Sequence, residues 1–284
     1  MKHLKNILSQ YKSKLILIYF YMLVAESLLI IEPFILGKSI DGLILGSFDW
    51  IVFLFILFIV SNIFMYKRMV YDTKVYTEIY NEIVLKFVNN KKVSNSAKIA
   101  RTDMANQLID FIEHYAHFYI STLITVVGSL YFIFHQNYYV GFTVLACIPF
   151  LSLIVIKFYK KIKQATVVGH DHYEQKVDII NKENTIEIDT FFKRRRKLLI
   201  MSSNLQGKNW ILINSTKSLF LVLGLVFLSK TSINLTEGEL ISSYAYINNF
   251  LIALISIPIG AESFSRIKDV IKRIKPNDEE IERK

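Results

Sequence analysis

The sequence predicts an all-α integral membrane protein with six transmembrane helices and two long cytoplasmic helical hairpins. Hydrophobic residues make up 52% of the 284 residues, yet the formal net charge is +10. The Lys and Arg residues are segregated from the apolar runs, as is typical of membrane proteins. Only 10 Gly, 4 Pro and a single cysteine, Cys147, are present, which excludes collagen-like chains and disulfide scaffolds.

Six apolar runs are long enough to cross about 30 Å of hydrocarbon at 1.5 Å per residue. The first follows a basic N-terminus, but it is too long for a signal peptide, contains Glu26 and lacks a small-residue cleavage site. We therefore expect it to be a retained span. The predicted spans lie near residues 15–36, 49–66, 118–134, 138–157, 210–229 and 240–260.

The distribution of positive charge predicts the orientation. Of the 34 Lys and Arg residues, all but Lys38, Lys217 and Lys230 lie before the first span, in the connections 67–117 and 157–209, or after the last span. By the positive-inside rule, both termini and both long connections are cytoplasmic. We expect the protein in a membrane of the bacterial inner (plasma) type.

The two long connections are predicted to be helical hairpins. Residues 67–117 contain no Gly or Pro, and residues 157–209 contain only two Gly, so nothing breaks a helix that leaves the membrane. In the first hairpin an apolar stripe recurs every fourth residue. We expect the chain to turn at Asn89–Ser96 and near Glu183–Asp189. The stripe consists of Tyr71, Val75, Ile79, Ile83 and Phe87.

The last span carries the most specific motif. The segment LTEGELISSYAYINNFLIALISIPIG (Leu235–Gly260) resembles the last span of ABC exporters, which opens with L-T-x-G-x-L and has a late proline. In the segment AESFSRIKDVI that follows, Arg266 and Ile267 match the family pattern. The positions that match in the span are Thr236, Gly238, Leu240, Tyr246 and Pro258.

The hairpins are similar to those of the same family. SAKIARTDMANQLIDFIEHY resembles the stretch after the first coupling helix, with Asp103 at the acidic position, and ENTIEIDTFF resembles the second coupling-helix region. Both lack the glycine of the family. The resemblance implies a six-helix transmembrane domain over residues 1–275, followed by a charged tail, 276–284, and a helix-exchanged dimer of this chain with itself or with a related half.

The chain contains no GxxxxGK[ST] loop to bind phosphates, so we expect no nucleotide-binding domain and no ATPase activity on it. The resemblance implies that ATP is used by a separately encoded ATPase subunit that docks on the hairpin tips. The candidate docking residues are Ser94, Arg101, Asp103, Glu183 and Glu187.

Residues inside the spans are candidates for a substrate cavity. Glu26 lies near the middle of the first span, where an ionised carboxylate costs on the order of 2.5–3.5 kcal/mol. It either packs at a helix interface or serves as a cavity ligand or proton carrier, and Lys217 could pair with it or snorkel to water. Tyr246 and Asn249 lie on the span that lines the pathway in the family.

The sequence gives little support for a metal site or for nucleic-acid binding. His114 and His117, like His170 and His172, lack a third ligand for zinc, so we expect no metal site. The run KRRRK at 193–197 is interpreted as a solvated face, a patch near anionic headgroups or a docking surface for an acidic partner, and no nucleic acid is expected.

The predicted function is that of a transport subunit of the exporter type, for an unknown small-molecule or peptide cargo. Two alternatives stay open. One is an ATPase-free carrier or channel coupled to ions through Glu26. The other is a membrane scaffold or receptor that transports nothing. A membrane enzyme is the weakest alternative because no nucleophile and base stand out.

Overall fold

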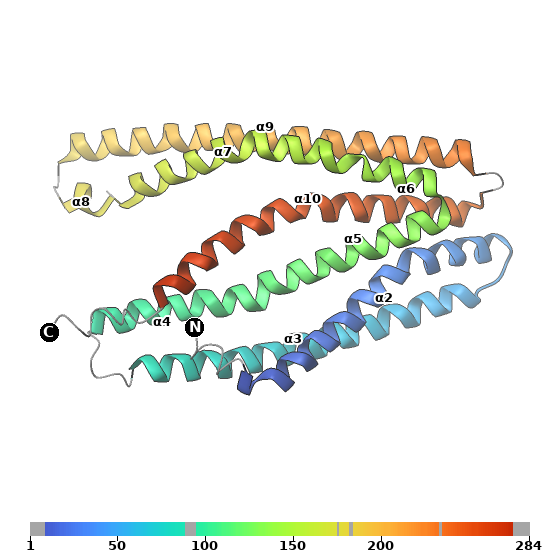
Figure 1. The fold of residues 1–284 in the computed structure, drawn as a ribbon, viewed down its shortest axis with the longest axis horizontal. Coiled ribbons are helices and arrows are strands. Elements are labelled where there is room, and N and C mark those ends of the chain that lie inside the picture. Colours follow the sequence, from blue (N-terminus) through green and yellow to red (C-terminus); the bar gives the residue numbers. More distant parts are fainter. Residues whose placement is uncertain (1–8, 89–94, 175, 182–183, 233–234, 275–284) are drawn as a thin grey trace. The chain divides into compact units, whose positions relative to one another are not determined.

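The computed structural model describes residues 9–88, 95–174, 176–181, 184–232 and 235–274, and these residues form helices and short connections without any β-strand (Figure 1). Six of the helical segments are long and apolar enough to cross a membrane. The predicted class, an all-α protein with six candidate spans, is therefore confirmed. The helix that contains the first predicted span, 15–36, continues to Ile44, so most of the connection to the second predicted span is helical.

The described residues divide into two compact units. The first unit takes its residues from 1–136 and 232–284, and the second from Asn137–Thr231. The helices of the first unit are α2 (Lys12–Ile44), α3 (Asp49–Val88), α4 (Asn95–Asp110), the π-helical η1 (Phe111–Ala116), α5 (His117–Gln136) and α10 (Glu237–Ile274). Those of the second unit are α6 (Tyr138–Leu145), α7 (Cys147–Glu174), α8 (Lys176–Asn181) and α9 (Thr185–Thr231).

In the first unit, α2 and α3 run antiparallel and side by side (Figure 1). They are joined by a tight turn in which Gly46 has φ of 78°, a value that favours glycine. Tyr21 of α2 packs edge-on against Phe64 and Tyr71 of α3, with ring centroids 6.0 and 6.5 Å apart. These contacts fix which residues of the two helices lie at the same level.

The C-terminal part of α3 and helix α4, which we call the two arms of the first hairpin, pack against each other through the predicted stripe. Val75, Ile79 and Ile83 are buried in one cluster with Ala105 and Ile109 of α4. A spacing of four residues places these side chains on one face of α3, and burying that face holds the two arms together. The side chain of Phe87 and most of the predicted turn Asn89–Ser96 lie outside the described residues.

In the second unit, the predicted fourth span begins at a cap and contains a break. The Asn137 side chain accepts hydrogen bonds from the backbone N–H groups of Tyr139 (3.0 Å) and Val140 (3.2 Å), which starts α6. The α-helix is interrupted between Leu145 and Cys147. Pro149 explains the break, because a proline ring clashes with the carbonyl group four residues earlier.

The second hairpin turns earlier than predicted. The Asn184 side chain accepts hydrogen bonds from the N–H groups of Ile186 (3.0 Å) and Glu187 (3.4 Å) and so caps α9. Residues 185–189 therefore belong to the first turns of a helix and not to the connection. From this cap α9 runs for 47 residues to Thr231.

Candidate functional site

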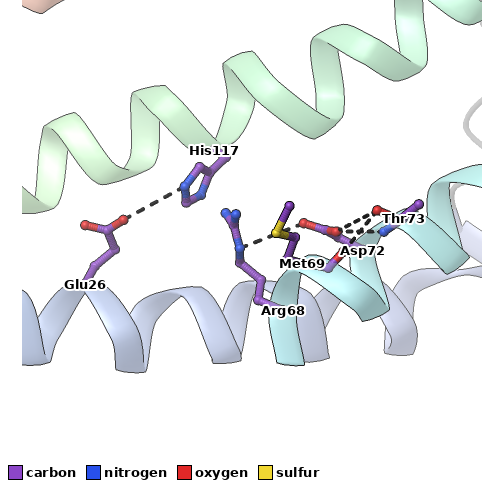
Figure 2. Close-up of polar contacts among 6 residues, drawn as sticks. All are labelled: Glu26, Arg68, Met69, Asp72, Thr73 and His117. Atoms are coloured by element: carbon purple, nitrogen blue, oxygen red, sulfur yellow. Dashed lines mark hydrogen bonds and ion pairs between the residues drawn. The ribbon is translucent and has the colours of Figure 1, made fainter. Parts of the chain in front are cut away.

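A buried carboxylate faces an imidazole between α2 and α5 in the first unit. Glu26 is only 6% exposed, and its Oε1 lies 3.9 Å from Nε2 of His117 (Figure 2). This distance is too long for a hydrogen bond, but it is short enough for strong attraction when the imidazole is protonated. Among the described residues, His117 is the basic side chain found within ion-pair distance of Glu26.

An ion pair within α3 lies beside Glu26 and His117. Nε of Arg68 lies 3.8 Å from Oδ2 of Asp72, one helical turn further along, and both side chains are largely buried. The N–H of Thr73 donates a 2.7 Å hydrogen bond to Asp72. Figure 2 shows Arg68 pointing toward the space next to His117. We call Glu26, Arg68, Asp72 and His117 the polar cluster.

The polar cluster has unused hydrogen-bonding capacity. Nδ1 of His117 and Nε of Arg68 are buried, and neither has a hydrogen-bond partner among the described residues. A buried polar atom without a partner costs about 1–3 kcal/mol. The cluster is therefore suited to bind a further polar group, such as a water molecule or a polar atom of a cargo.

Glu26 lies level with residues at the predicted limits of two other spans. Arg68 follows the apolar run of α3, and His117 directly precedes that of α5. The position of Glu26 beside His117 joins it to these two charged or polar side chains. Its depth in a membrane stays a prediction.

Tyr246 is held by contacts inside the first unit. Its side chain is fully buried, its hydroxyl donates a 3.0 Å hydrogen bond to the carbonyl oxygen of Ile30, and its ring stacks on Phe132 with centroids 4.6 Å apart. These contacts give the ring a packing role. Asn249, on the same helix, is half-buried. The cavity roles of both residues stay predictions.

Lys217 lies on α9 of the second unit and is half-buried. Its pairing with Glu26, which belongs to the first unit, stays a prediction.

Sequence reasoning considered His117 only as a metal ligand, although its position directly before an apolar run is a signal for a boundary residue. Among the residues that the structure describes, no three His, Cys, Asp or Glu side chains gather in a way that could hold a metal ion.

The structure describes the side chains of only two of the candidate docking residues. Asp103 is exposed on α4, and Glu187 is exposed in the first turn of α9. Arg101 belongs to α4, but its side chain is not described, and Ser94 and Glu183 lie outside the described residues, as does the tail 276–284. Their docking role stays a prediction.

At the opposite end of the first unit, α10 is fastened to α2. Oδ2 of Asp41 accepts a 2.8 Å hydrogen bond from the Thr236 hydroxyl, and Oδ1 accepts a 2.9 Å hydrogen bond from the N–H of Gly238. Gly37 and Gly238 touch through their backbones. We call these four residues the clasp. Sequence reasoning singled out Thr236 and Gly238 but not their partner Asp41.

Comparison with known proteins agrees with this architecture. A family model described as "ABC transporter transmembrane region" matches residues 4–238. The match spans both units and ends at the second residue of α10. A comparison with curated proteins gives no match.

Proposed function

The chain belongs to the family of ABC transporter transmembrane regions, and on that premise we propose that two such chains enclose a translocation pathway driven by a separately encoded ATPase. Its family and its six candidate spans make the chain an integral membrane protein and a transport subunit. The second copy is this chain or a related half, and the cargo is an unknown small molecule or peptide.

The length of the helices is the observation that carries this proposal. At 1.5 Å per residue, the 47 residues of α9 extend about 70 Å and the 40 residues of α3 about 60 Å. The hydrocarbon core needs only about 30 Å. Each helix therefore continues at least about 30 Å beyond the hydrocarbon core. The positive charge of these extensions favours the cytoplasmic side, where a soluble ATPase could reach their tips.

The division into two units supports the helix-exchanged dimer of the proposal. The helices α7 and α9 pack on each other, and Nδ2 of Asn137 donates a 2.7 Å hydrogen bond to the Thr231 hydroxyl, which closes the second unit on itself. A unit with its own internal contacts can be exchanged between two copies as a body.

The polar cluster and the cavity candidates complete the proposal. Glu26, with His117 beside it, offers a polar contact for cargo near the predicted cytoplasmic boundary. Lys217, Tyr246 and Asn249 remain candidates for the pathway wall. Both termini are cytoplasmic in this proposal, and the membrane is of the bacterial inner type.

The test is affinity purification from the native membrane in mild detergent, followed by mass spectrometry. We expect a nucleotide-binding protein in stoichiometric amount, and we expect Glu187→Lys to release it. Glu237→Lys is a matched control, because Glu237 is also exposed in the first turn of a helix but lies at the opposite end of the chain's spans. Purification of the chain with no ATPase would refute the proposal.

The burial of Glu26 next to His117 favours one alternative, an ion-coupled carrier without an ATPase. In that case Glu26→Gln abolishes uptake driven by a pH gradient in proteoliposomes. Equal flux of variant and parent would eliminate this alternative. A chain that supports no flux with or without the ATPase would instead be a scaffold.

A further inference from the structure

A second carboxylate of α2, that of Glu32, lies further along the helix than Glu26. The Glu32 side chain is half-buried, and in the part of the chain that the structure describes it has no hydrogen-bond or ion-pair partner. Leu28 and Leu36, about one helical turn before and after it, both pack against a buried apolar cluster between α2 and α3. Glu32 therefore lies at the edge of an apolar interface with its charge unbalanced.

The register of α2 and α3 gives the level of Glu32. The apolar cluster contains Leu57 of α3, and Glu32 lies near the level of this residue because the two helices run antiparallel. Helix α3 has no charged residue and no histidine between Asp49 and Lys67. At 1.5 Å per residue, Leu57 lies about 12 Å from the first of these charges and about 15 Å from the second. A carboxylate in the middle of an apolar span indicates a functional site.

The proline that follows Glu32 frees a backbone acceptor in the same turn. Pro33 lies inside α2 and has no N–H, so the carbonyl group of Leu29, four residues earlier, lacks its usual helical donor. The next carbonyl group, that of Ile30, accepts a 3.0 Å hydrogen bond from the Tyr246 hydroxyl of α10. Carbonyl groups of this turn are therefore accessible to donors from outside the helix.

Glu32 and the carbonyl group of Leu29 form one set of acceptors. Residues three apart are neighbours on a helix surface, and side chains lean toward the N-terminus, so the carboxylate lies over the turn that contains Leu29. The set has two carboxylate oxygens and one carbonyl oxygen, and it carries one negative charge. A primary ammonium group matches it, with one positive charge and three N–H donors.

We propose that Glu32 and the Leu29 carbonyl bind the primary ammonium group of an amine cargo. The inference rests on the proposed transport function and names the chemical class of its cargo. Ile31, which precedes Glu32, is 37% exposed and provides apolar surface for the hydrocarbon part of the amine. A divalent metal ion is a poorer occupant, because it takes about six or more oxygen ligands and the described residues contain no group of three metal-ligating side chains.

The test is protection of Glu32 from dicyclohexylcarbodiimide, an apolar reagent that modifies carboxyl groups, in membrane vesicles that contain the full chain. Mass spectrometry of peptides follows the fraction of Glu32 that is modified in any form. The probe is hexylamine, which is protonated near pH 7 as lysine is. Saturating hexylamine should slow the modification about fivefold or more.

Two compounds of the same chain length are controls for the probe. Hexan-1-ol lacks the charge, and hexyltrimethylammonium has the charge but no N–H donors, so both should protect Glu32 much less than hexylamine does. Absence of protection by hexylamine, equal protection by all three compounds, or a Glu32 that the reagent never modifies would overturn the proposal.

Two substitutions test the two parts of the site. Pro33→Ala restores an N–H for the Leu29 carbonyl, so half-protection should need about three- to tenfold more hexylamine, and an unchanged concentration would contradict the role of the carbonyl. Glu26→Gln is the matched control, because Glu26 is buried on the same helix about 9 Å away, and protection of Glu32 should be unchanged. Loss of protection in this control would overturn the assignment to Glu32. Copurification of the ATPase is measured separately, so failure here leaves the proposed function intact.

Discussion

The clasp between α2 and α10 makes Gly238→Ala the most informative substitution in the chain. A methyl group on Gly238 would overlap the carbonyl oxygen of Gly37 and would lie 2.7 Å from Cγ of Asp41. The carbonyl oxygen is backbone and cannot rotate away, so the two helices must separate. Separation also stretches the hydrogen bonds that Asp41 accepts from Thr236 and Gly238.

The expected cost combines two terms. Overpacking at a tight contact costs about 1–3 kcal/mol. A hydrogen bond to a charged group contributes about 1.5–3 kcal/mol when buried, and less when exposed or partly buried as the two bonds to Asp41 are. We expect Gly238→Ala to lower the free energy of unfolding by about 2–4 kcal/mol. The measurement is equilibrium unfolding in mixed micelles, followed by circular dichroism.

Gly207→Ala is the matched control, because a methyl group at Gly207 in α9 would meet no atom within 4 Å. Alanine is the better helix former, so this variant should be as stable as the parent or more stable by up to about 1 kcal/mol. The combination of Gly238→Ala with Asp41→Ala should cost less than the sum of the single changes, since both act on one contact. Equal stability of Gly238→Ala and Gly207→Ala would refute the reasoning.

Three further outcomes follow from the described contacts, and each is measured by the same unfolding assay. Tyr246→Phe removes the hydrogen bond to Ile30 but keeps the stack on Phe132, so it should cost about 0.5–1.5 kcal/mol, and a cost as large as that of Tyr246→Ala would contradict this. His117→Ala leaves Glu26 buried without its neighbour. It should lower the free energy of unfolding by about 1–3 kcal/mol more in the parent than in a Glu26→Gln background. Additive losses from the two substitutions would exclude a coupling of the pair. Gly128→Ala would press on the flexible side chain of Ile30, which can change rotamer, so it should be tolerated better than Gly238→Ala, and the reverse order would show that backbone contact is not decisive.

Much of the fold could be predicted from the sequence because hydropathy and charge act over whole segments. The long apolar runs, the absence of helix breakers in the arms and the stripe that contains Val75, Ile79 and Ile83 predict helices that the structure confirms. The interruption before Cys147 was not predicted, although Pro149 was a local signal for it. The π-helical turn η1 leaves no comparable signal in composition or spacing.

The candidate site was harder to predict because its contacts join distant parts of the chain. Glu26 was identified as an unusual intramembrane carboxylate, but its neighbour His117 depends on how α2 and α5 pack, which no local pattern encodes. The same holds for Asp41, whose carboxylate is matched to Thr236 and Gly238 only when α2 meets α10. Side chains that a pattern marks as unusual can be found from sequence, whereas their partners cannot.

The π-helical turn Phe111–Ala116 sets the phase between the arm α4 and the span α5. A π-turn holds one residue more than an α-turn, and each residue of an α-helix rotates the direction of its side chain by about 100°. The exposed side of α4 is thus rotated about the helix axis relative to the exposed side of α5. Deleting one residue here would return the turn to α-helical geometry and swing Asp103 and Asp110 about a quarter of the way around the helix axis. A single additional residue between α4 and α5 therefore decides which surface of α4 is exposed.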